Sequence, residues 1–450
     1  MKQFDGPVYD ARTLGKPRML VLGFQHMFAM FGATVLVPAL TGLSVSATLL
    51  FAGLGTLLFH LLTKGKVPAF LGSSFAFIGG YAAIAPMLPN EAGDCVIPNT
   101  ELLPYACFGV AVAGLMYVIL SALFKVFGVK KVMRYFPPIV TGPIIIAIGL
   151  TLSSSAINNC NASWPVALVA IAVVIFCNIW GKGMIKIIPI LIGVIVSYIV
   201  GALCGQVDFT SVREAAWFGL PFQWDNTVFG LLGSGSVDSG LLLTAVITIV
   251  PISLATMVEH IGDICAISST CERNFMAEPG FHRTLLGDGL ATTLASLFGA
   301  PANTTYGENT GVLALSKVYD PRVIRIAAVL AVIFSCSPKF AAVVSAMPVA
   351  TIGGVSMVLY GMISAVGVRN VVENKVDFTN TRNVIIAALI LVLAIGINYS
   401  AAGALVLGPV QLSGLATAAL VGIILNAVLP GKDYEFVQED EGSTSVNFKV

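Results

Sequence analysis

The stretch from Pro301 to Lys317 combines the side chains of this sequence that are best suited to bind a small polar molecule. It holds the carboxylate of Glu308, two asparagines, several hydroxyls and two glycines inside a very apolar chain. The part through Tyr306 is rich in β-branched and turn-forming residues, whereas the part after Gly307 is typical of a helix. A helix that begins inside a membrane exposes unpaired backbone N–H groups and the positive end of its dipole. We therefore expect a ligand site at membrane depth, centred on Glu308.

Two further carboxylates, Glu259 and Asp263, are four residues apart and therefore share one face of a helix. They follow Pro251, which is expected to kink this segment. Carboxylates inside a membrane are costly and functional by default, although each can instead make a structural hydrogen bond to a neighbouring helix. Asp288 is expected to cap the short apolar segment that it begins. His26 is expected to support the site from behind rather than to bind the ligand.

The composition is that of a polytopic membrane protein. Hydrophobic residues make up 57% of the chain and charged residues only 10%, against about 25% charged in soluble domains. No basic run indicates a nucleic-acid partner, and the eight cysteines do not have metal-site spacing. The sequence contains no P-loop motif, so ATP is not expected to drive the protein directly. Buried carboxylates, whose pKa rises on desolvation, favour coupling to protons.

Fourteen apolar segments approach the ~20 residues that a membrane span needs. They lie at about 19–40, 43–63, 67–86, 102–127, 137–157, 164–180, 186–205, 240–263, 283–299, 301–318, 321–340, 345–367, 382–400 and 411–430. If the N-terminus is cytoplasmic, all of the 24 basic residues except Arg213 and Lys339 fall on the inner side. The positive-inside rule predicts such a bias, so we expect a multi-pass protein of the inner or plasma membrane with both termini cytoplasmic.

Fourteen spans divide into two halves of seven, and an odd repeat number gives the halves opposite orientation. The expected parts are a cytoplasmic N-terminus (1–18), a first repeat (19–205), an outer loop (206–239), a second repeat (240–430) and a cytoplasmic tail (431–450). The aromatic residues of the outer loop suit an interfacial surface helix: Trp217, Phe218, Phe222 and Trp224.

The third and tenth spans have a similar residue order. Each runs from a proline through a short extended piece to glycine and small polar residues, and then into a helix: Pro68 to Phe77 in the third, Pro301 to Lys317 in the tenth. Interrupted spans at matching positions indicate a central binding site. The alternative is that the small residues only allow close helix packing.

The signature Glu308-Asn309-Thr310-Gly311, followed by Ser316-Lys317, resembles that of the nucleobase–ascorbate transporter family of nucleobase:cation symporters. Ser316 replaces the usual threonine. The match covers nearly the whole chain and is greatest with the bacterial uracil permeases, because xanthine and urate branches have glutamine where this chain has Glu308. Further matching stretches are Gln25–Thr34, Gly72–Phe77, Glu259–Gly262 and Leu359–Gly361. One departure is Asp263, where uracil permeases often have a proton-linked histidine.

The resemblance implies an all-α membrane fold of two inverted seven-span repeats, with short antiparallel strands in the third and tenth spans. Spans one to four and eight to eleven would form a core domain, and spans five to seven and twelve to fourteen a gate domain. The resemblance also implies a homodimer held through the gate domains and an elevator-like movement of the core. The function it implies is transport, not enzymatic catalysis.

The site that the resemblance implies is a uracil pocket. Glu259 and Glu308 would accept from the two N–H groups of uracil, and the backbone N–H groups of Phe75 and Gly307 would donate to its carbonyls. Phe75 and Tyr306 would pack on the ring, while Ala33 and Tyr360 close the pocket. Glu259 and Asp263 share a helix face, and we expect them to hold the coupling proton between them, in place of the glutamate and histidine of related permeases. Supporting residues would be His26, Ser74, Asn309, Gly311, Ser316 and Lys317.

No metal and no cofactor are expected besides the coupling ion, and the partners expected are a nucleobase, the lipid bilayer and a second copy of the chain. Within the family the alternatives are a purine permease for xanthine or urate and a broader pyrimidine permease. Outside it, the alternative is an anion transporter that shares the inverted-repeat plan. Two carboxylates in one site disfavour an anion, because like charges repel.

Overall fold

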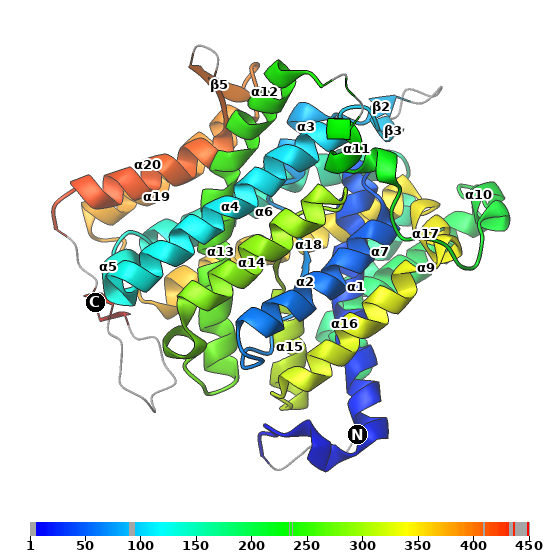
Figure 1. The fold of residues 1–450 in the computed structure, drawn as a ribbon, viewed down its shortest axis with the longest axis horizontal. Helices are drawn as coiled ribbons and strands as arrows, with labels where there is room; N and C mark the ends of the chain where they lie inside the picture. The colour runs from blue at the N-terminus through cyan, green and yellow to red at the C-terminus, as the bar shows by residue number, and fades with distance from the viewer. Residues whose placement is uncertain are drawn as a thin grey trace.

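The computed structural model describes residues 6–89, 95–233, 235, 237–407, 410–431, 435–436 and 448–449. Within these ranges the chain is mostly helical, and its short strands form two-stranded pairs. Figure 1 shows long helices that run side by side, with the N-terminal segment near the end of α15 (Gly307–Ser316) at one end of the bundle.

The seven apolar segments expected between residues 19 and 205 coincide with helices or with strand–helix units. The elements of this half are η1 (Ala11–Leu14), α1 (Lys16–Thr41), α2 (Val45–Leu62), β1 (Leu71–Ser73), α3 (Ile78–Ile84), β2 (Leu88–Pro89), β3 (Cys95–Ile97), α4 (Leu103–Phe127), α5 (Val129–Met133), α6 (Pro138–Cys160), α7 (Trp164–Ile179), α8 (Met184–Ile187) and α9 (Pro189–Leu203). The third expected span is the strand β1 followed by the short helix α3, so its interruption is present in the fold.

The rest of the chain follows a similar order after the connecting segment. Its elements are α10 (Thr210–Glu214), η2 (Trp224–Asn226), α11 (Val228–Gly233), α12 (Ser239–Ile249), η3 (Val250–Ile252), α13 (Ser253–Thr270), η4 (Met276–Gly280), α14 (Phe281–Leu297), β4 (Asn303–Thr305), α15, α16 (Pro321–Ser335), α17 (Pro338–Ser345), α18 (Val349–Glu373), α19 (Thr381–Asn398), β5 (Ala404–Leu407), β6 (Val410–Ser413), α20 (Gly414–Val428), β7 (Glu435–Phe436) and β8 (Phe448–Lys449). The tenth expected span is again a strand followed by a helix, β4 and α15.

Among the described helices, seven are long and apolar enough to cross a membrane, and α16 with α17 adds an eighth if this pair, bent by 88°, counts as one span. Helices α7, α9 and α20 are apolar but shorter, with 16, 15 and 15 residues. In the described part of the chain, fewer helices are long enough to span a membrane than the sequence has apolar segments, because several of the fourteen segments are short helices or strand–helix units.

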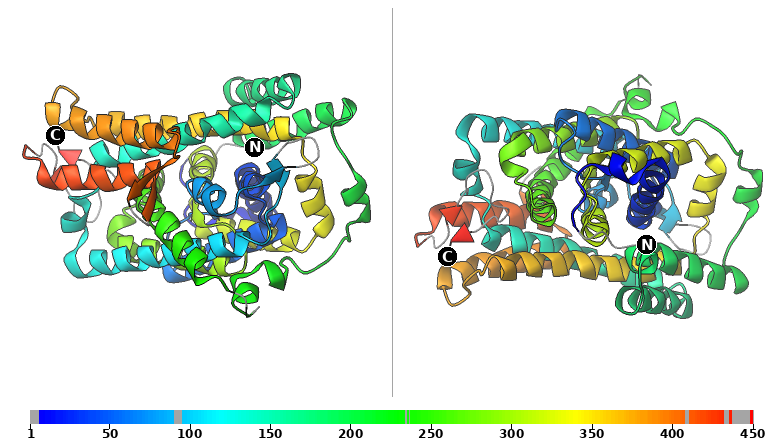
Figure 2. Two further views of the ribbon diagram at one scale, coloured as in Figure 1. Left: turned by 90° about the horizontal axis from the view of Figure 1, so that it is seen from above. Right: turned by 90° about the horizontal axis from the view of Figure 1, so that it is seen from below.

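Helix packing in the first half has a counterpart in the second half. Helix α2 packs on α16 and α14 packs on α4, while α1 packs on α16 and α12 packs on α4. The pairs α7–α9 and α19–α20 correspond in the same way, as do α7–α18 and α19–α6. Figure 2 shows α18 and α19 along one long edge of the molecule, with α2 and α4 along the opposite edge. The two halves are therefore built on one plan.

Glycine makes the close contact between α4 and α14 achievable. A Cβ atom at Gly114 would lie 2.8 Å from the carbonyl oxygen of Gly289, and a Cβ at Gly289 would lie 2.6 Å from that of Gly114. Real Cβ atoms do not approach a backbone oxygen so closely, so this crossing depends on small residues, as is usual between membrane helices.

Pro251 lies in η3, which separates α12 from α13, so the predicted break in the eighth segment is confirmed. The outer loop differs from expectation. Its described helices are α10, η2 and α11, whereas Trp217 and Phe218 lie between α10 and η2 with exposed side chains. These two residues are not helical. The backbone N–H of Gly219, the residue after Phe218, donates to the carbonyl oxygen of Cys336 at the end of α16.

Candidate functional site

The two interrupted spans meet through their strands. β1 pairs antiparallel with β4, with Leu71 opposite Thr305 and Ser73 opposite Asn303. The pairing continues at both ends, where Ser74 N donates to Ala302 O at 2.8 Å and Tyr306 N donates to Phe70 O at 3.0 Å. All six strand residues are buried. The strand pair satisfies the buried backbone groups, so an extended piece of chain is stable inside the helix bundle.

Helix α15 begins at Gly307, directly after the strand pair. Its N-cap residue, Tyr306, makes no side-chain hydrogen bond to the first turn. The residues from Pro301 to Tyr306 are buried, but Gly307 is exposed, and a Cβ at Gly307 would meet no described heavy atom within 4 Å. The positive end of α15, which follows a buried strand, therefore faces open space, and this arrangement can bind an electronegative group.

The Tyr306 ring crosses over Gly72 of the opposite strand. A Cβ at Gly72 would lie 2.5 Å from Cε2 of that ring, so only glycine fits there. The Tyr306 hydroxyl donates to Ser73 O at 2.9 Å, and the Thr34 hydroxyl donates to the Tyr306 oxygen at 3.3 Å. This side chain thus joins α1, β1 and β4. Its predicted contact with the ring of a nucleobase stays a prediction.

The predicted supporting pair His26 and Asn309 is brought together. Asn309 Nδ2 donates to the backbone oxygen of His26 at 3.1 Å and lies 3.2 Å from His26 Nδ1. Both side chains are buried. This contact holds the first turn of α15 against α1. It thereby fixes the position of Asn309, the signature residue next to Glu308.

Glu259 and Asp263 both lie on α13, are half-buried and are one helical turn apart. The Thr305 hydroxyl, from the last residue of β4, donates to Asp263 Oδ2 at 2.7 Å. Because α13 also packs against α15, this hydrogen bond connects the carboxylate pair directly to the strand that precedes Gly307. For Glu308, the structure describes the backbone in α15, while its side chain lies outside the described part of the structure.

The remaining predicted ring contacts come from three elements. Phe75 lies in the turn between β1 and α3, and its ring meets that of Tyr360 on α18 edge to face, with centroids 5.9 Å apart. Phe75 is expected from the sequence to donate its backbone N–H as the first residue of the half-helix in the third span, but α3 begins only at Ile78, and the Phe75 carbonyl accepts from Ile78 N at 3.1 Å. Ala33 is fully buried on α1, beside Thr34.

The remaining predicted supporting residues lie further from Gly307 along the chain. Gly311 is exposed within α15, and the Ser316 hydroxyl stays near the end of that helix, where it accepts from Val318 N at 3.3 Å. Lys317 is the C-cap in a left-handed conformation with an exposed side chain. Ser74 is buried beside the strand pair. Of these residues, Ser316 and Lys317 lie at the C-terminal end of α15.

Sequence reasoning missed the role of Asp288 and its neighbour. α14 begins at Phe281, so Asp288 is inside the helix, fully buried, and the expected cap at this position is wrong. Asp288 Oδ2 lies 2.8 Å from Nδ1 of His260, which is also fully buried and next to Glu259. The only signal in the sequence is a histidine and an aspartate in apolar segments; their pairing depends on the packing of α13 against α14.

The comparisons with known proteins agree with this architecture. A permease family model matches residues 17–403. The uracil permease of Bacillus caldolyticus is 39% identical over 436 residues, 94% of this chain and 94% of that protein, and the uracil permease of Bacillus subtilis is 39% identical over 434 residues, 94% and 93%.

Two solved structures show a similar fold. The transmembrane domain of a cyanobacterium bicarbonate transporter, BicA, aligns with a TM-score of 0.56 at 14% identity, over 94% of this chain and 99% of that one. SLC26A9 aligns with a TM-score of 0.66 at 12% identity, over 93% and 66%. At these identities the likeness concerns the fold alone. The family model and the relatives decide the classification: this chain is a multi-pass membrane protein that belongs to the permease family, and it is a transporter and not an enzyme.

Proposed function

We propose that this chain imports uracil across the cell membrane by proton symport. The observation that carries the proposal is the start of α15 at Gly307, where a helix N-terminus without a side-chain cap faces open space among buried residues. The relatives that match nearly the whole chain at 39% identity are named as uracil permeases, which supports this choice of substrate.

Uracil has two N–H donors and two carbonyl acceptors, and the site offers groups of both kinds. In the proposal, the carboxylates of Glu259 and Glu308 accept from the N–H groups, and the Gly307 N–H donates to a carbonyl. The N–H of Phe75 donates to the second carbonyl while its ring packs on the base. Ala33, Tyr306 and Tyr360 complete the walls. Charge-assisted hydrogen bonds of this type are stronger than neutral ones and would select the pyrimidine by its pattern.

The proposed proton carrier is the pair formed by Glu259 and Asp263. Two carboxylates one turn apart in a partly buried site do not readily ionise together, so they would hold one proton between them. The hydrogen bond from Thr305 to Asp263 supports a coupling role, because a change in charge at Asp263 acts on the strand that leads into Gly307. His260, the residue after Glu259, lies 2.8 Å from Asp288 of α14, and this pair would hold α13 in place beside the site.

The proposed architecture is fourteen spans in two inverted repeats. The paired packing of the two halves and the likeness to the BicA and SLC26A9 folds support it. The core would contain spans one to four and eight to eleven, including both strands, and would move like an elevator against a gate of spans five to seven and twelve to fourteen. A homodimer held through the gates and cytoplasmic termini complete the proposal.

A competition experiment separates uracil from the alternative substrates. Uptake of labelled uracil into proteoliposomes is measured with an excess of unlabelled uracil, thymine, cytosine, xanthine, urate or bicarbonate. We expect uracil to compete strongly, and xanthine, urate and bicarbonate to leave uptake unchanged. Stronger competition by a purine would identify a purine permease, and equal competition by cytosine would identify a broad pyrimidine permease.

Replacing Glu308 tests the substrate contact directly. The amide in Glu308→Gln presents a donor to a uracil N–H donor and leaves a mismatched buried pair, so uracil uptake should fall about tenfold or more. Uptake is measured with equal amounts of wild-type protein and variant in the membrane, and Glu373→Gln, at the exposed end of α18, is the control. Wild-type kinetics in Glu308→Gln would remove Glu308 from the substrate site.

A further inference from the structure

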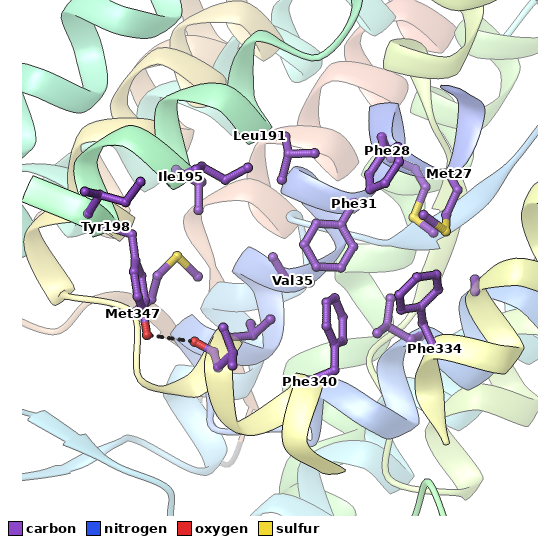
Figure 3. A pocket seen from close by; sticks show the side chains of 17 residues that line it. Met27, Phe28, Phe31, Val35, Leu191, Ile195, Tyr198, Phe334, Phe340 and Met347 are labelled. Atoms are coloured by element: carbon purple, nitrogen blue, oxygen red, sulfur yellow. Dashed lines mark hydrogen bonds between the residues drawn. The ribbon is translucent and has the colours of Figure 1, made fainter. Parts of the chain in front are cut away.

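A second cavity lies away from the strand pair, between α1, α9, α16 and α17. Its volume is about 300 Å³, and only apolar surface lines it. Figure 3 shows the rings of Phe31, Phe334 and Phe340 on one side and Leu191 and Ile195 of α9 on the other. The one hydroxyl in its wall, that of Tyr198, donates to the backbone of Val343 at 3.2 Å. The cavity therefore offers a ligand no polar group.

This cavity is distinct from the proposed uracil site. On α1 it is lined by Met27, Phe28, Met30, Phe31 and Val35, of which Met27, Phe31 and Val35 are spaced four residues apart and share one face. His26 and Ala33, the residues of α1 predicted for the uracil site, lie on the opposite face, because each is nearly half a helical turn away from Phe31. The cavity and the predicted uracil site thus share helix α1 but none of its residues.

The cavity opens onto the apolar exterior of the protein. Three of its lining side chains are widely exposed: Ile195 is 49% exposed, Ile199 53% and Val343 40%. Ile195 and Ile199 are on α9, and Val343 is on α17, which bends by 88° from α16 and so turns across the end of that helix. In a membrane protein such a surface faces hydrocarbon, and an apolar cavity connected with it fits an acyl chain better than water, which needs polar partners.

Charged groups gather at one rim of this cavity. Lys339 precedes Phe340 in α17, and its Nζ lies 5.1 Å from the centre of the Trp217 ring and 3.4 Å from the backbone oxygen of Arg213. Its backbone N–H also donates to Ala216 at 2.9 Å, so the rim is tied to the segment after α10. Lys339 and Arg213 are the two basic residues that depart from the inner-side pattern of the whole sequence.

The segment that contacts this rim carries two carboxylates, Asp208 and Glu214, in and beside α10; the ring of Phe209, next to Asp208, meets that of the lining residue Tyr198 with centroids 6.3 Å apart. Asp208 accepts from the backbone and hydroxyl of Thr210, and Glu214 is exposed. Two cations and two carboxylates beside one cavity complement a zwitterionic headgroup, with its phosphate at the cations and its ammonium at the carboxylates. An anionic headgroup such as that of phosphatidylglycerol would meet both attraction and repulsion.

We propose that this cavity is a phospholipid site, with one acyl chain of phosphatidylethanolamine between α1, α9 and α17 and its phosphate at Lys339. Aromatic residues at the membrane interface commonly hold such headgroups, and Trp217 is 70% exposed beside Lys339. Helix α9 belongs to the proposed gate, and α1 and α16 to the proposed core. A chain bound between them changes the contact across which the two domains would slide.

Lipid retention tests this proposal without any measurement of transport. Protein in detergent is mixed with phosphatidylethanolamine or phosphatidylglycerol, and the bound lipid is counted by native mass spectrometry. We expect about one phosphatidylethanolamine per wild-type chain. Retention should fall at least about threefold in Lys339→Gln, which removes the cation, and in Val343→Phe, which fills the cavity. A threefold change corresponds to about 0.7 kcal/mol of binding free energy.

Matched variants separate the lipid contact from a loss of structure. Lys339→Arg keeps the cation and should retain the lipid, as should Lys182→Gln and Ile119→Phe, which change an exposed lysine and an exposed apolar residue outside the cavity. Equal retention in wild type, Lys339→Gln and Val343→Phe would overturn the site, and preferential retention of phosphatidylglycerol would overturn the headgroup. A lower dimer fraction in Val343→Phe with unchanged retention would mean that a second copy of the chain fills the cavity.

Discussion

Asp263 connects a carboxylate of α13 with the strand β4 through a hydrogen bond. Its carboxylate accepts from Thr305 at 2.7 Å, and Thr305 is two residues before Gly307. Glu259 lies one turn earlier on α13, and its role in the proposal is to bind the base. In the proposal, Glu259 and Glu308 contact uracil, Glu259 and Asp263 share the proton, and Asp263 transmits a change in their charge to β4 through Thr305.

Asp263→Asn should keep uracil binding but alter its pH dependence. Asparagine still accepts from Thr305 through its amide oxygen, and the proposed base contacts are unchanged, so the Kd for uracil should stay within about threefold. Without the shared proton, the pH profile of uptake should flatten or shift. Equilibrium binding and uptake from pH 5 to 8 measure the two effects. Lost binding would make Asp263 a direct ligand, and an unchanged profile would make it a structural hydrogen-bond partner.

Gly72→Ala should destabilise the strand crossing. The added methyl group would lie 2.5 Å from Cε2 of Tyr306 and 2.9 Å from the Thr34 hydroxyl, so the ring must move away from its hydrogen bonds. Overpacking of this kind costs about 1–3 kcal/mol. Thermal unfolding in detergent and uracil uptake measure the effect. Gly79→Ala in α3 is the matched control, because a Cβ there meets no described atom within 4 Å; equal unfolding temperatures for the two variants would refute the steric argument.

At the scale of elements, the segment before α1 fastens together the C-terminal ends of the two helices that carry the site, α13 and α15. Val8 N donates to Lys317 O and Tyr319 N donates to Val8 O, both at 2.8 Å. The Tyr9 hydroxyl donates to Cys271 O, just after α13, at 3.0 Å, and Arg273 stacks on its ring at 4.1 Å. The ends of α13 and α15 are thereby held together, so the carboxylates of α13 and the N-terminus of α15 are expected to move as one unit.

Removing the Tyr9 side chain should loosen this fastening. In Tyr9→Ala the hydrogen bond to Cys271 and the contact with Arg273 are lost, and the two backbone bonds of Val8 lose their support. Hydrogen exchange at the amides of Val8 and Tyr319 should become faster by about tenfold, the equivalent of about 1.4 kcal/mol of opening free energy. Tyr135→Ala, at an exposed tyrosine elsewhere, is the control. Unchanged exchange would mean that Tyr9 is not needed to hold the segment.

The same segment should respond to acid through Asp10. Hydrogen bonds from Arg12, with a smaller contribution from the charge of Arg322, lower the pKa of this carboxyl from 3.8 to about 2. A pKa lowered in the folded state stabilises the attached segment above the unfolded value, and this contribution is lost as the pH falls from about 4 through 2. The N–H of Arg12 donates to Asp10 Oδ1 at 3.1 Å, so amide exchange of Arg12, corrected for its intrinsic rate, should rise over this range. Asp10→Asn should already show the faster exchange at pH 6; slow exchange there would exclude Asp10 as the cause.

At the scale of the whole molecule, the proposed transport cycle needs a proton gradient. No ATP-binding P-loop is present in the sequence, whereas carboxylates lie half-buried beside the strand pair. Labelled uracil uptake into proteoliposomes in sodium-free buffer should follow an imposed pH gradient and fall to the level of protein-free vesicles on addition of a protonophore. Strict sodium dependence with indifference to the protonophore would show that another ion drives uptake.

The sequence alone located the apolar segments, because hydropathy and charge are sums over neighbouring residues. It also located the two interruptions, since proline and glycine act on the backbone at their own positions: β1 precedes α3, and β4 ends two residues before Gly307. Family membership followed from a linear motif around Glu308, and the family model and relatives confirm it. The antiparallel strand pair, expected from the resemblance, is present as well.

Tertiary structure decided which of these residues meet. Asn309 contacts His26 across 283 residues, and Tyr306 contacts Ser73 across 233. The partners of Asp263 and of Asp288, Thr305 and His260, come from other elements, and nothing local in the sequence joins them. Hydrogen bonds and ring contacts act over only a few ångströms, so they exist only where helices pack at a definite height and rotation. That packing is a property of the whole bundle, and it alone placed Tyr306 over Gly72 and Asp288 inside α14.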